Sequence, residues 1–151
     1  MLSKEETVQL SAQYAEKGFL CSEAVLLALS KCLEISSDII PRIATGLGGG
    51  IGRVGEVCGA LTGGVLGLGL KFGRTEVSAE PLARPPCWFA AELATQFQAQ
   101  FGHLRCRDLL GLDVSSKEDR RMYLEQKMWE TKCRKFITVA TGLAYTLLLK
   151  E

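Results

Sequence analysis

Hydrophobic residues recur at helical spacing along most of the chain, and no stretch alternates polar and apolar residues as a half-buried strand does. The pattern predicts a first helix over about residues 4–17. Ser3 and Glu6 form the capping box that opens this helix, and Gly18 ends it. We therefore expect an all-α fold, a compact bundle of about five to seven helices with the most apolar helices at its centre.

A second helix opens near Cys21, and Ser22 is its predicted cap. Residues 24–29 are continuously apolar, so this helix is predicted to be central rather than at the surface. A short helix over about residues 39–46 should follow, because serine and aspartate residues precede it and Pro41 fits a first turn.

Glycine is concentrated in residues 46–70, which hold most of the protein's 16 glycines. The first half of this stretch is too rich in glycine for a helix and too poor in side chains for a strand, so we expect an irregular loop with positive φ angles. From Val57 onward, glycines at positions 59, 63 and 67 would line one helix face and let another backbone approach closely. The pattern predicts a loop that delivers Cys58 to the first turn of a tightly packed helix. Such a face could also pack against a second copy, so a homo-oligomer is a further expectation.

The segment after this helix should connect it to a second group of helices. Residues 73–84 are polar and predict a loop, after which Pro85 and Pro86 start a helix that Gly102 ends. Residues 103–111 predict a short helical turn that carries Cys106 between two arginines.

Two more helices complete the predicted bundle. Ser115 and Glu118 form a second capping box at the start of a charged helix. The residues that we expect to be buried at or near this helix are Met122, Leu124 and Met128. The last helix is expected over about residues 131–149, with Cys133 in its first turn and Gly142 matching the glycine face described above. All elements are assigned to a single domain over residues 1–151.

Composition limits the classes of function. With 47% hydrophobic and 23% charged residues, the chain has the balance of a folded globular protein. Its net charge of +1 lacks the basic excess of a nucleic-acid-binding protein, and the clusters at Arg120 and Arg121 and at residues 132–135 are interpreted as solvated helix faces. The N-terminal residues do not form a signal peptide, and the longest apolar runs are shorter than the roughly 18 residues of a membrane span. We therefore expect a cytoplasmic protein without a transmembrane segment.

Six cysteines are many for a reducing compartment, where they point to thiol redox chemistry or metal binding more often than to structural disulfides. No two of them are separated by two residues, and His103 is the only histidine, so the usual zinc and thioredoxin-type motifs are not present. At a helix start, Cys58 should ionise more easily than an ordinary thiol, although a small buried core residue is the alternative. Cys32 and Cys87 are interpreted as structural residues of the core.

The glycine loop contains a sequence typical of nucleotide-binding proteins. Gly50, Gly52 and Gly55 match the dinucleotide fingerprint G-x-G-x-x-G, but the residues before them predict a helix instead of the strand that the fingerprint requires. A weaker interpretation is that backbone N–H groups of the loop contact an anion or the sulfides of a cluster. The candidate residues for contact with a cofactor are Gly49, Gly50, Gly52, Gly55 and Gly59.

The order of four cysteines resembles a known family. Cys21, then Cys58 with the following Gly-Ala-Leu-Thr-Gly, then Cys106 and Cys133, is similar to the C_GCAxxG_C_C family of small redox-active proteins of prokaryotes. Some members of that family are selenoproteins, which the resemblance connects with a nucleophilic redox role. The resemblance implies that these four cysteines form the site and that Cys32 and Cys87 do not belong to it.

Two hypotheses of different class follow. In the first, the protein is a thiol–disulfide oxidoreductase in which a pair among the four cysteines cycles between dithiol and disulfide, with Cys58 as attacking thiol and Cys21 or Cys106 as its partner. In the second, Cys21, Cys58, Cys106 and Cys133 bind an iron–sulfur cluster or a zinc ion. Both hypotheses place the four cysteines in one small neighbourhood, and neither identifies the electron partner.

Overall fold

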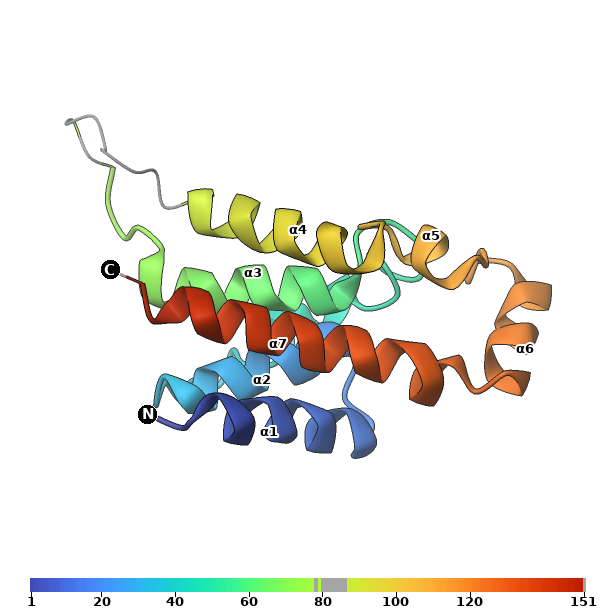
Figure 1. Ribbon diagram of the computed structural model, residues 1–151, viewed down its shortest axis with the longest axis horizontal. Helices are drawn as coiled ribbons and strands as arrows, with labels where there is room; N and C mark the ends of the chain where they lie inside the picture. The colour runs from blue at the N-terminus through green and yellow to red at the C-terminus, as the bar shows by residue number, and fades with distance from the viewer. Residues whose placement is uncertain (78, 80–86, 151) are drawn as a thin grey trace.

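The computed structural model describes residues 1–77, 79 and 87–150, and helices account for its regular structure (Figure 1). In chain order these are α1 (Lys4–Glu16), α2 (Cys21–Cys32), the 3₁₀ turn η1 (Arg42–Leu47), α3 (Gly59–Phe72), α4 (Cys87–Phe101), α5 (Cys106–Leu110), α6 (Lys117–Glu125), the π-helical turn η2 (Trp129–Cys133) and α7 (Arg134–Leu148). The described residues contain no strand, and one isolated bridge pairs Val57 with Arg105. The all-α prediction is confirmed.

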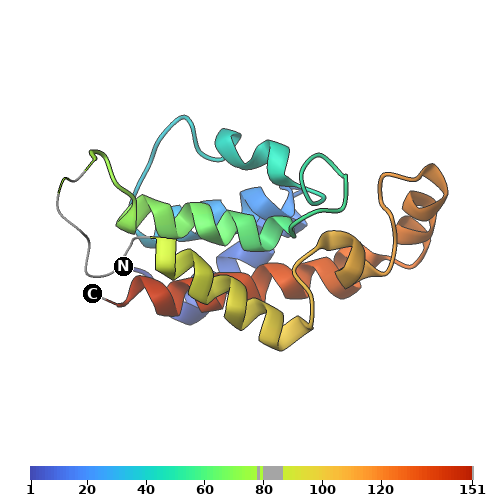
Figure 2. The same cartoon turned by 90° about the horizontal axis from the view of Figure 1, so that it is seen from above.

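Helix α7 is the central element of the bundle. It contacts α1, α2, α3 and α4, and its fully buried face includes Ile137, Ala140 and Ala144. Helix α2 supplies Leu26 and Leu29 to the same core, as its continuous apolar run predicted. Figures 1 and 2 show the long helices running side by side, with the glycine loop, α5 and α6 gathered at the end of the bundle away from the two termini. No described helix is long and apolar enough to span a membrane.

The glycine face of α3 packs against α2. A Cβ atom added to Gly63 would lie 2.5 Å from the carbonyl oxygen of Ser22, and one added to Gly67 would lie 2.3 Å from Cδ1 of Leu29. The predicted close approach is thus confirmed, and the face is occupied within the chain rather than offered to a second copy. The prediction for Gly142 is wrong, because this glycine faces α1, where a Cβ would meet the side chains of Lys4 and Val8.

The first two helices begin in different ways. The capping box of α1 is formed as predicted, with Ser3 and Glu6 exchanging hydrogen bonds. Ser22 is not the cap of α2, because the helix begins at Cys21 and the Glu23 carboxylate accepts a hydrogen bond from the N–H of Leu20. Ser22 is buried instead, and its hydroxyl donates to the carbonyl of Ala44 at 2.7 Å.

The predicted helix over residues 39–46 is shorter and tighter in the structure. Turns precede Arg42, and the helical segment is η1, in which Ala44 donates to the carbonyl of Pro41 in a 3₁₀-type bond. The glycines that follow in the sequence end this segment before an α-helix can propagate.

The loop predicted for residues 73–84 is confirmed only where residues 73–77 and 79 lie outside any helix. The predicted roles of Pro85 and Pro86 fall outside the described residues. Helix α4 begins at Cys87 and is followed by Gly102, which has a positive φ of 84° as expected of a helix stop.

Helix α6 departs most from its prediction. Its cap is Ser116, which accepts a hydrogen bond from the N–H of Asp119, and not Ser115. Met122 and Leu124 are 39% and 72% exposed, whereas Met128 is buried as predicted. Figure 1 shows α6 beyond the end of the bundle, and none of its residues is buried.

Candidate functional site

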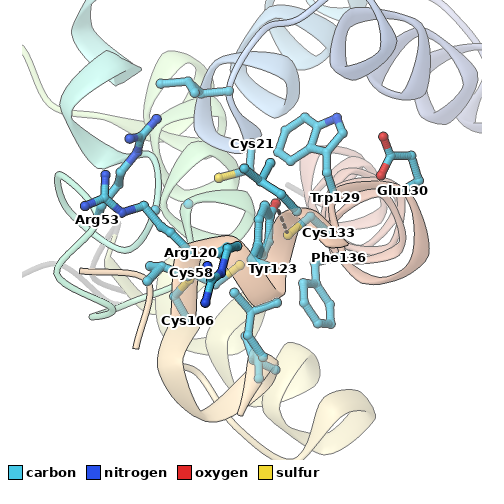
Figure 3. Close-up of a pocket in the computed structure, with 18 of the residues that line it drawn as sticks. Cys21, Arg53, Cys58, Cys106, Arg120, Tyr123, Trp129, Glu130, Cys133 and Phe136 are labelled. Atoms are coloured by element: carbon cyan, nitrogen blue, oxygen red, sulfur yellow. Dashed lines mark hydrogen bonds between the residues drawn. The ribbon is translucent and has the colours of Figure 1, made fainter. Parts of the chain in front are cut away.

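A pocket of about 1180 Å³ lies at the end of the bundle where the glycine loop, α5, α6 and the start of α7 meet (Figures 1 and 3). Cys21, Cys58, Cys106 and Cys133 all line it. Cys32 is buried at the other end of α2, so its core interpretation is confirmed. Cys87 is exposed at the start of α4, so its core interpretation is wrong. The structure therefore separates the six cysteines as the sequence predicted, four around one pocket and two elsewhere.

The glycine loop wraps one side of this pocket. Five successive residues, 49–53, have φ angles between 57° and 69°, and two of them, Ile51 and Arg53, are not glycine. Backbone hydrogen bonds within the loop hold this conformation; for example, the N–H of Glu56 donates to the carbonyl of Gly50 at 2.9 Å. A branched residue such as Ile51 rarely adopts a positive φ, and such strain is common at functional sites. The predicted irregular loop is confirmed, and η1 rather than a strand precedes it.

Cys21 is the first residue of α2, and its sulfur lies against the glycine loop and the start of α3. The backbone N–H groups of Gly49, Ser22 and Gly59 are near enough to this sulfur to affect its ionisation. A Cβ added to Gly59 would be 2.3 Å from this sulfur, so only glycine fits there. Burial raises the pKa of the Cys21 thiol, and these N–H groups act in the opposite direction.

Cys58 is the residue before α3 and is 5% exposed. The backbone N–H groups of Ala60 and Leu61 at this helix start act to lower its pKa, and the Leu61 N–H also donates to the Cys58 carbonyl at 3.0 Å. Burial nevertheless raises its pKa well above the usual range, and the nearby Cys21 and Cys106 thiols add to the increase. The prediction that Cys58 ionises easily is wrong, because desolvation of a buried thiolate outweighs two N–H donors.

An isolated antiparallel β-bridge between Val57 and Arg105 places the segment that carries Cys106 beside the segment that carries Cys58. The N–H of Cys58 donates to the carbonyl of Leu104 at 2.8 Å, and the N–H of Cys106 donates to the carbonyl of Glu56 at 2.7 Å. Burial and the Cys21 thiol raise the pKa of Cys106 to about 11, although Arg107 lowers it. Two segments that are distant in the sequence thus hold these thiols at neighbouring positions.

Cys133 does not lie in the first turn of a helix, as predicted, but at the end of η2 in a continuous helical segment. Its N–H is therefore within the helix, and no free helix start stabilises its thiolate. Its sulfur is instead 3.3 Å from the hydroxyl of Tyr123 on α6. Burial raises the pKa of Cys133 to about 12, against the lowering effect of this hydrogen bond.

The residues that line the pocket, the four cysteines included, form two walls. The glycine wall consists of Cys21, Gly49, Arg53, Cys58, Gly59 and Cys106, and presents much backbone. The aromatic wall consists of Tyr123, Leu124, Trp129, Cys133 and Phe136, from α6, η2 and the start of α7. Phe19 and Leu109 are among the further apolar residues of the lining. Sequence reasoning identified none of the aromatic residues as part of the site, because nothing local in the sequence links α6 to distant cysteines.

The positions of the four thiols limit the metal centres that they could bind. Among the described residues, no three cysteine, histidine, aspartate or glutamate side chains are gathered closely enough to hold one metal ion. A zinc site needs its ligands about 2.3 Å from a single centre, so zinc does not fit this arrangement. A polynuclear cluster is larger, and four thiols around one pocket have the donor chemistry for it.

A helical protein with four cysteines around one pocket is the class that this fold and site define. The model of the family described as "Putative redox-active protein (C_GCAxxG_C_C)" matches residues 19–147, and the chain belongs to this family. It is also similar to an "Uncharacterized protein" of Archaeoglobus fulgidus, with 32% identity over 133 residues, 83% of this chain and 88% of the relative. No solved structure matched the chain.

Proposed function

We propose that the protein is a thiol redox protein in which Cys21 and Cys58 cycle between dithiol and disulfide. The observation that carries the proposal is the packing of the Cys21 sulfur against Gly59, the residue that directly follows Cys58. Cys21 is also the charged group that raises the pKa of Cys58 most. A disulfide requires two cysteines whose Cα atoms lie within about 7 Å, and the contact of the Cys21 sulfur with the residue after Cys58 favours this pair.

The geometry favours Cys21, rather than Cys58, as the attacking thiol. Cys21 is half-buried, and three backbone N–H groups near its sulfur stabilise a thiolate. Cys58 is 5% exposed and is better placed as the resolving thiol. A thiol with a high pKa ionises rarely, but its thiolate is the stronger nucleophile once formed.

The reaction that fits this pair is the reduction of a substrate disulfide. Cys21 releases its proton to solvent, and its thiolate attacks one substrate sulfur while the other leaves and takes up a proton. Cys58 then loses its proton and attacks the Cys21 sulfur, which releases the second substrate thiol. Two electrons and two protons pass from the protein dithiol to the substrate, and the protein is left with a Cys21–Cys58 disulfide.

The experiment that tests this pairing is disulfide mapping. The reduced protein is oxidised with 2-hydroxyethyl disulfide, remaining thiols are alkylated, and linked peptides are identified by mass spectrometry. We expect a Cys21–Cys58 link in the native protein, and no change in that link in a Cys32→Ser/Cys87→Ser control. A dominant link between Cys106 and Cys133, or no link, would contradict the proposal.

A second candidate is an iron–sulfur protein, favoured by the gathering of four thiols around one pocket and by N–H groups near the Cys21 sulfur. Cys21, Cys58, Cys106 and Cys133 would hold the cluster, which would supply one-electron transfer when bound. Its cations would also offset the mutual repulsion of the thiolates. Iron and acid-labile sulfide, measured on protein purified without oxygen, should be stoichiometric and lost in Cys58→Ser if this candidate is correct. Protein without iron would favour the dithiol reaction.

A further inference from the structure

We propose that the pocket binds small molecules with an apolar, ring-containing body and an anionic group, and that substrates of the proposed thiol reaction belong to this class. The second half of this statement rests on the proposed function, whereas the binding does not.

The size and lining of the pocket fit a small molecule. Its volume of about 1180 Å³ slightly exceeds the roughly 300–1,000 Å³ of typical ligand pockets, so a small molecule has room to enter. Phe19, Trp129 and Phe136 provide aromatic surface, and Leu109 and Val114 add aliphatic surface. Such a lining gains free energy by removing an apolar body from water.

The charges at the pocket favour an anion. Arg53 of the glycine loop and Arg120 of α6 both line the pocket and are exposed. Neither guanidinium forms a hydrogen bond or an ion pair with any described residue, so both can contact a ligand. Lys117, also in the lining, is equally unpaired among the described residues. Arginine presents a planar fork that suits carboxylate, sulfonate and phosphate groups.

Two acidic residues of the lining do not cancel this preference. Glu118 and Glu130 line the pocket with Arg53, Lys117, Arg120 and Arg121, so cations exceed anions by two. Figure 3 shows Arg53 on one side of the pocket and the Glu130 carboxylate on the other, beyond Trp129. An anionic group is therefore expected beside the arginines, on the side of the glycine wall.

The burial of the thiols argues for a small substrate rather than a protein. Cys58 is 5% exposed, and Cys21, Cys106 and Cys133 are half-buried within the pocket. The substrate disulfide has to reach the Cys21 sulfur inside the pocket, and a small molecule can enter the pocket whereas the rigid surface of another protein cannot.

Two fluorescent probes with the same ring system test the proposal. 1-Anilinonaphthalene-8-sulfonate carries a sulfonate, and N-phenyl-1-naphthylamine is its uncharged counterpart. We expect the native protein to bind the anionic probe about tenfold more tightly than the neutral one. Arg53→Gln/Arg120→Gln should remove this preference by weakening the anionic probe alone. The matched control, Arg42→Gln/Arg74→Gln, removes the same charge at exposed positions outside the pocket and should change neither affinity.

Equal affinities for the two probes in the native protein would overturn the proposal, and so would a preference that survives the loss of Arg53 and Arg120. Far-ultraviolet circular dichroism of each variant verifies that the fold is retained. The binding test does not involve the thiol reaction, because neither probe contains a disulfide. Probe preference without a Cys21–Cys58 link would thus refute the reaction alone, and the link without the preference would refute the substrate class alone.

Discussion

The two walls of the pocket are built in opposite ways. In the glycine wall, backbone lies against backbone and sulfur, and a single added methyl group at Gly59 has no space. The same holds one turn further along α3 at Gly63, outside the pocket, where α3 packs on α2. In the aromatic wall, long side chains from α6 and η2 cover the pocket, and α6 contributes no buried residue. The comparison indicates that the thiols of the glycine wall are held rigidly by the core, while the Cys133 thiol near α6 depends on side-chain contacts that can adjust.

The largest expected effect comes from a methyl group on the packed face of α3. Gly63→Ala places a Cβ 2.5 Å from the Ser22 carbonyl oxygen, and backbone cannot move aside as a flexible side chain can. We expect the free energy of unfolding to fall by about 3 kcal/mol. Chemical denaturation measures it, with Gly69→Ala as the matched control in the same helix.

Gly69 has no atom within 4 Å of an added Cβ, so its replacement should stabilise the protein by about 0.5–1 kcal/mol through helix propensity. Similar free energies of unfolding for the two variants would show that α2 and α3 are not in close contact. They would contradict the conclusion that the core holds the thiols of the glycine wall rigidly.

The next effect is the pH dependence of thiol alkylation. Only the thiolate reacts, and burial raises the pKa of all four pocket thiols, that of Cys106 to about 11. Their iodoacetamide rates, followed residue by residue by mass spectrometry, should rise about tenfold per pH unit from pH 7 to 9 and continue to rise. An unstructured cysteine peptide, as reference, levels off above its pKa of about 8.5. A pocket thiol whose rate levels off below pH 7 would show a stabilised thiolate and reverse this account of its burial.

Tyr123 provides a smaller test, directed at the aromatic wall. Its hydroxyl lies 3.3 Å from the Cys133 sulfur and lowers the pKa of that thiol. Tyr123→Phe removes this contribution, so the pKa of Cys133 should rise and its thiolate fraction at pH 8 should fall about fivefold. The alkylation rate of Cys133 reports the change, and Cys21 in the glycine wall serves as the internal control. If Cys133 does not slow, the hydrogen bond does not exist in solution.

The sequence predicted the glycine wall better than the aromatic wall, for a physical reason. Glycine spacing and the start of α3 are local features, and they sufficed to predict the loop, a close approach of another backbone and the position of Cys58, but not that α2 is the helix that approaches. The aromatic wall depends on where α6 lies relative to the bundle, and local propensity carries no information on this. For that reason Leu124 was predicted to be buried although it is 72% exposed.

Chemistry was harder to predict than position. A helix start indicates donors for a thiolate, and the N–H groups of Ala60 and Leu61 are indeed there. Desolvation depends on the whole pocket and reverses the sign of the expected pKa shift at Cys58. Similarly, the bridge that joins Cys58 to Cys106 pairs residues 57 and 105, which no short-range pattern connects.

The measurement that tests the central claim most directly is trapping of the mixed disulfide. Reduced Cys58→Ser is mixed with 2-hydroxyethyl disulfide, and the modified residue is located by mass spectrometry of the intact protein and its peptides. Because the resolving thiol is missing, we predict a stable adduct on Cys21, and no adduct on Cys58 in the reciprocal Cys21→Ser variant. An adduct on Cys106 or Cys133 in the first variant, or on Cys58 in the second, would contradict the assignment of Cys21 as the attacking thiol.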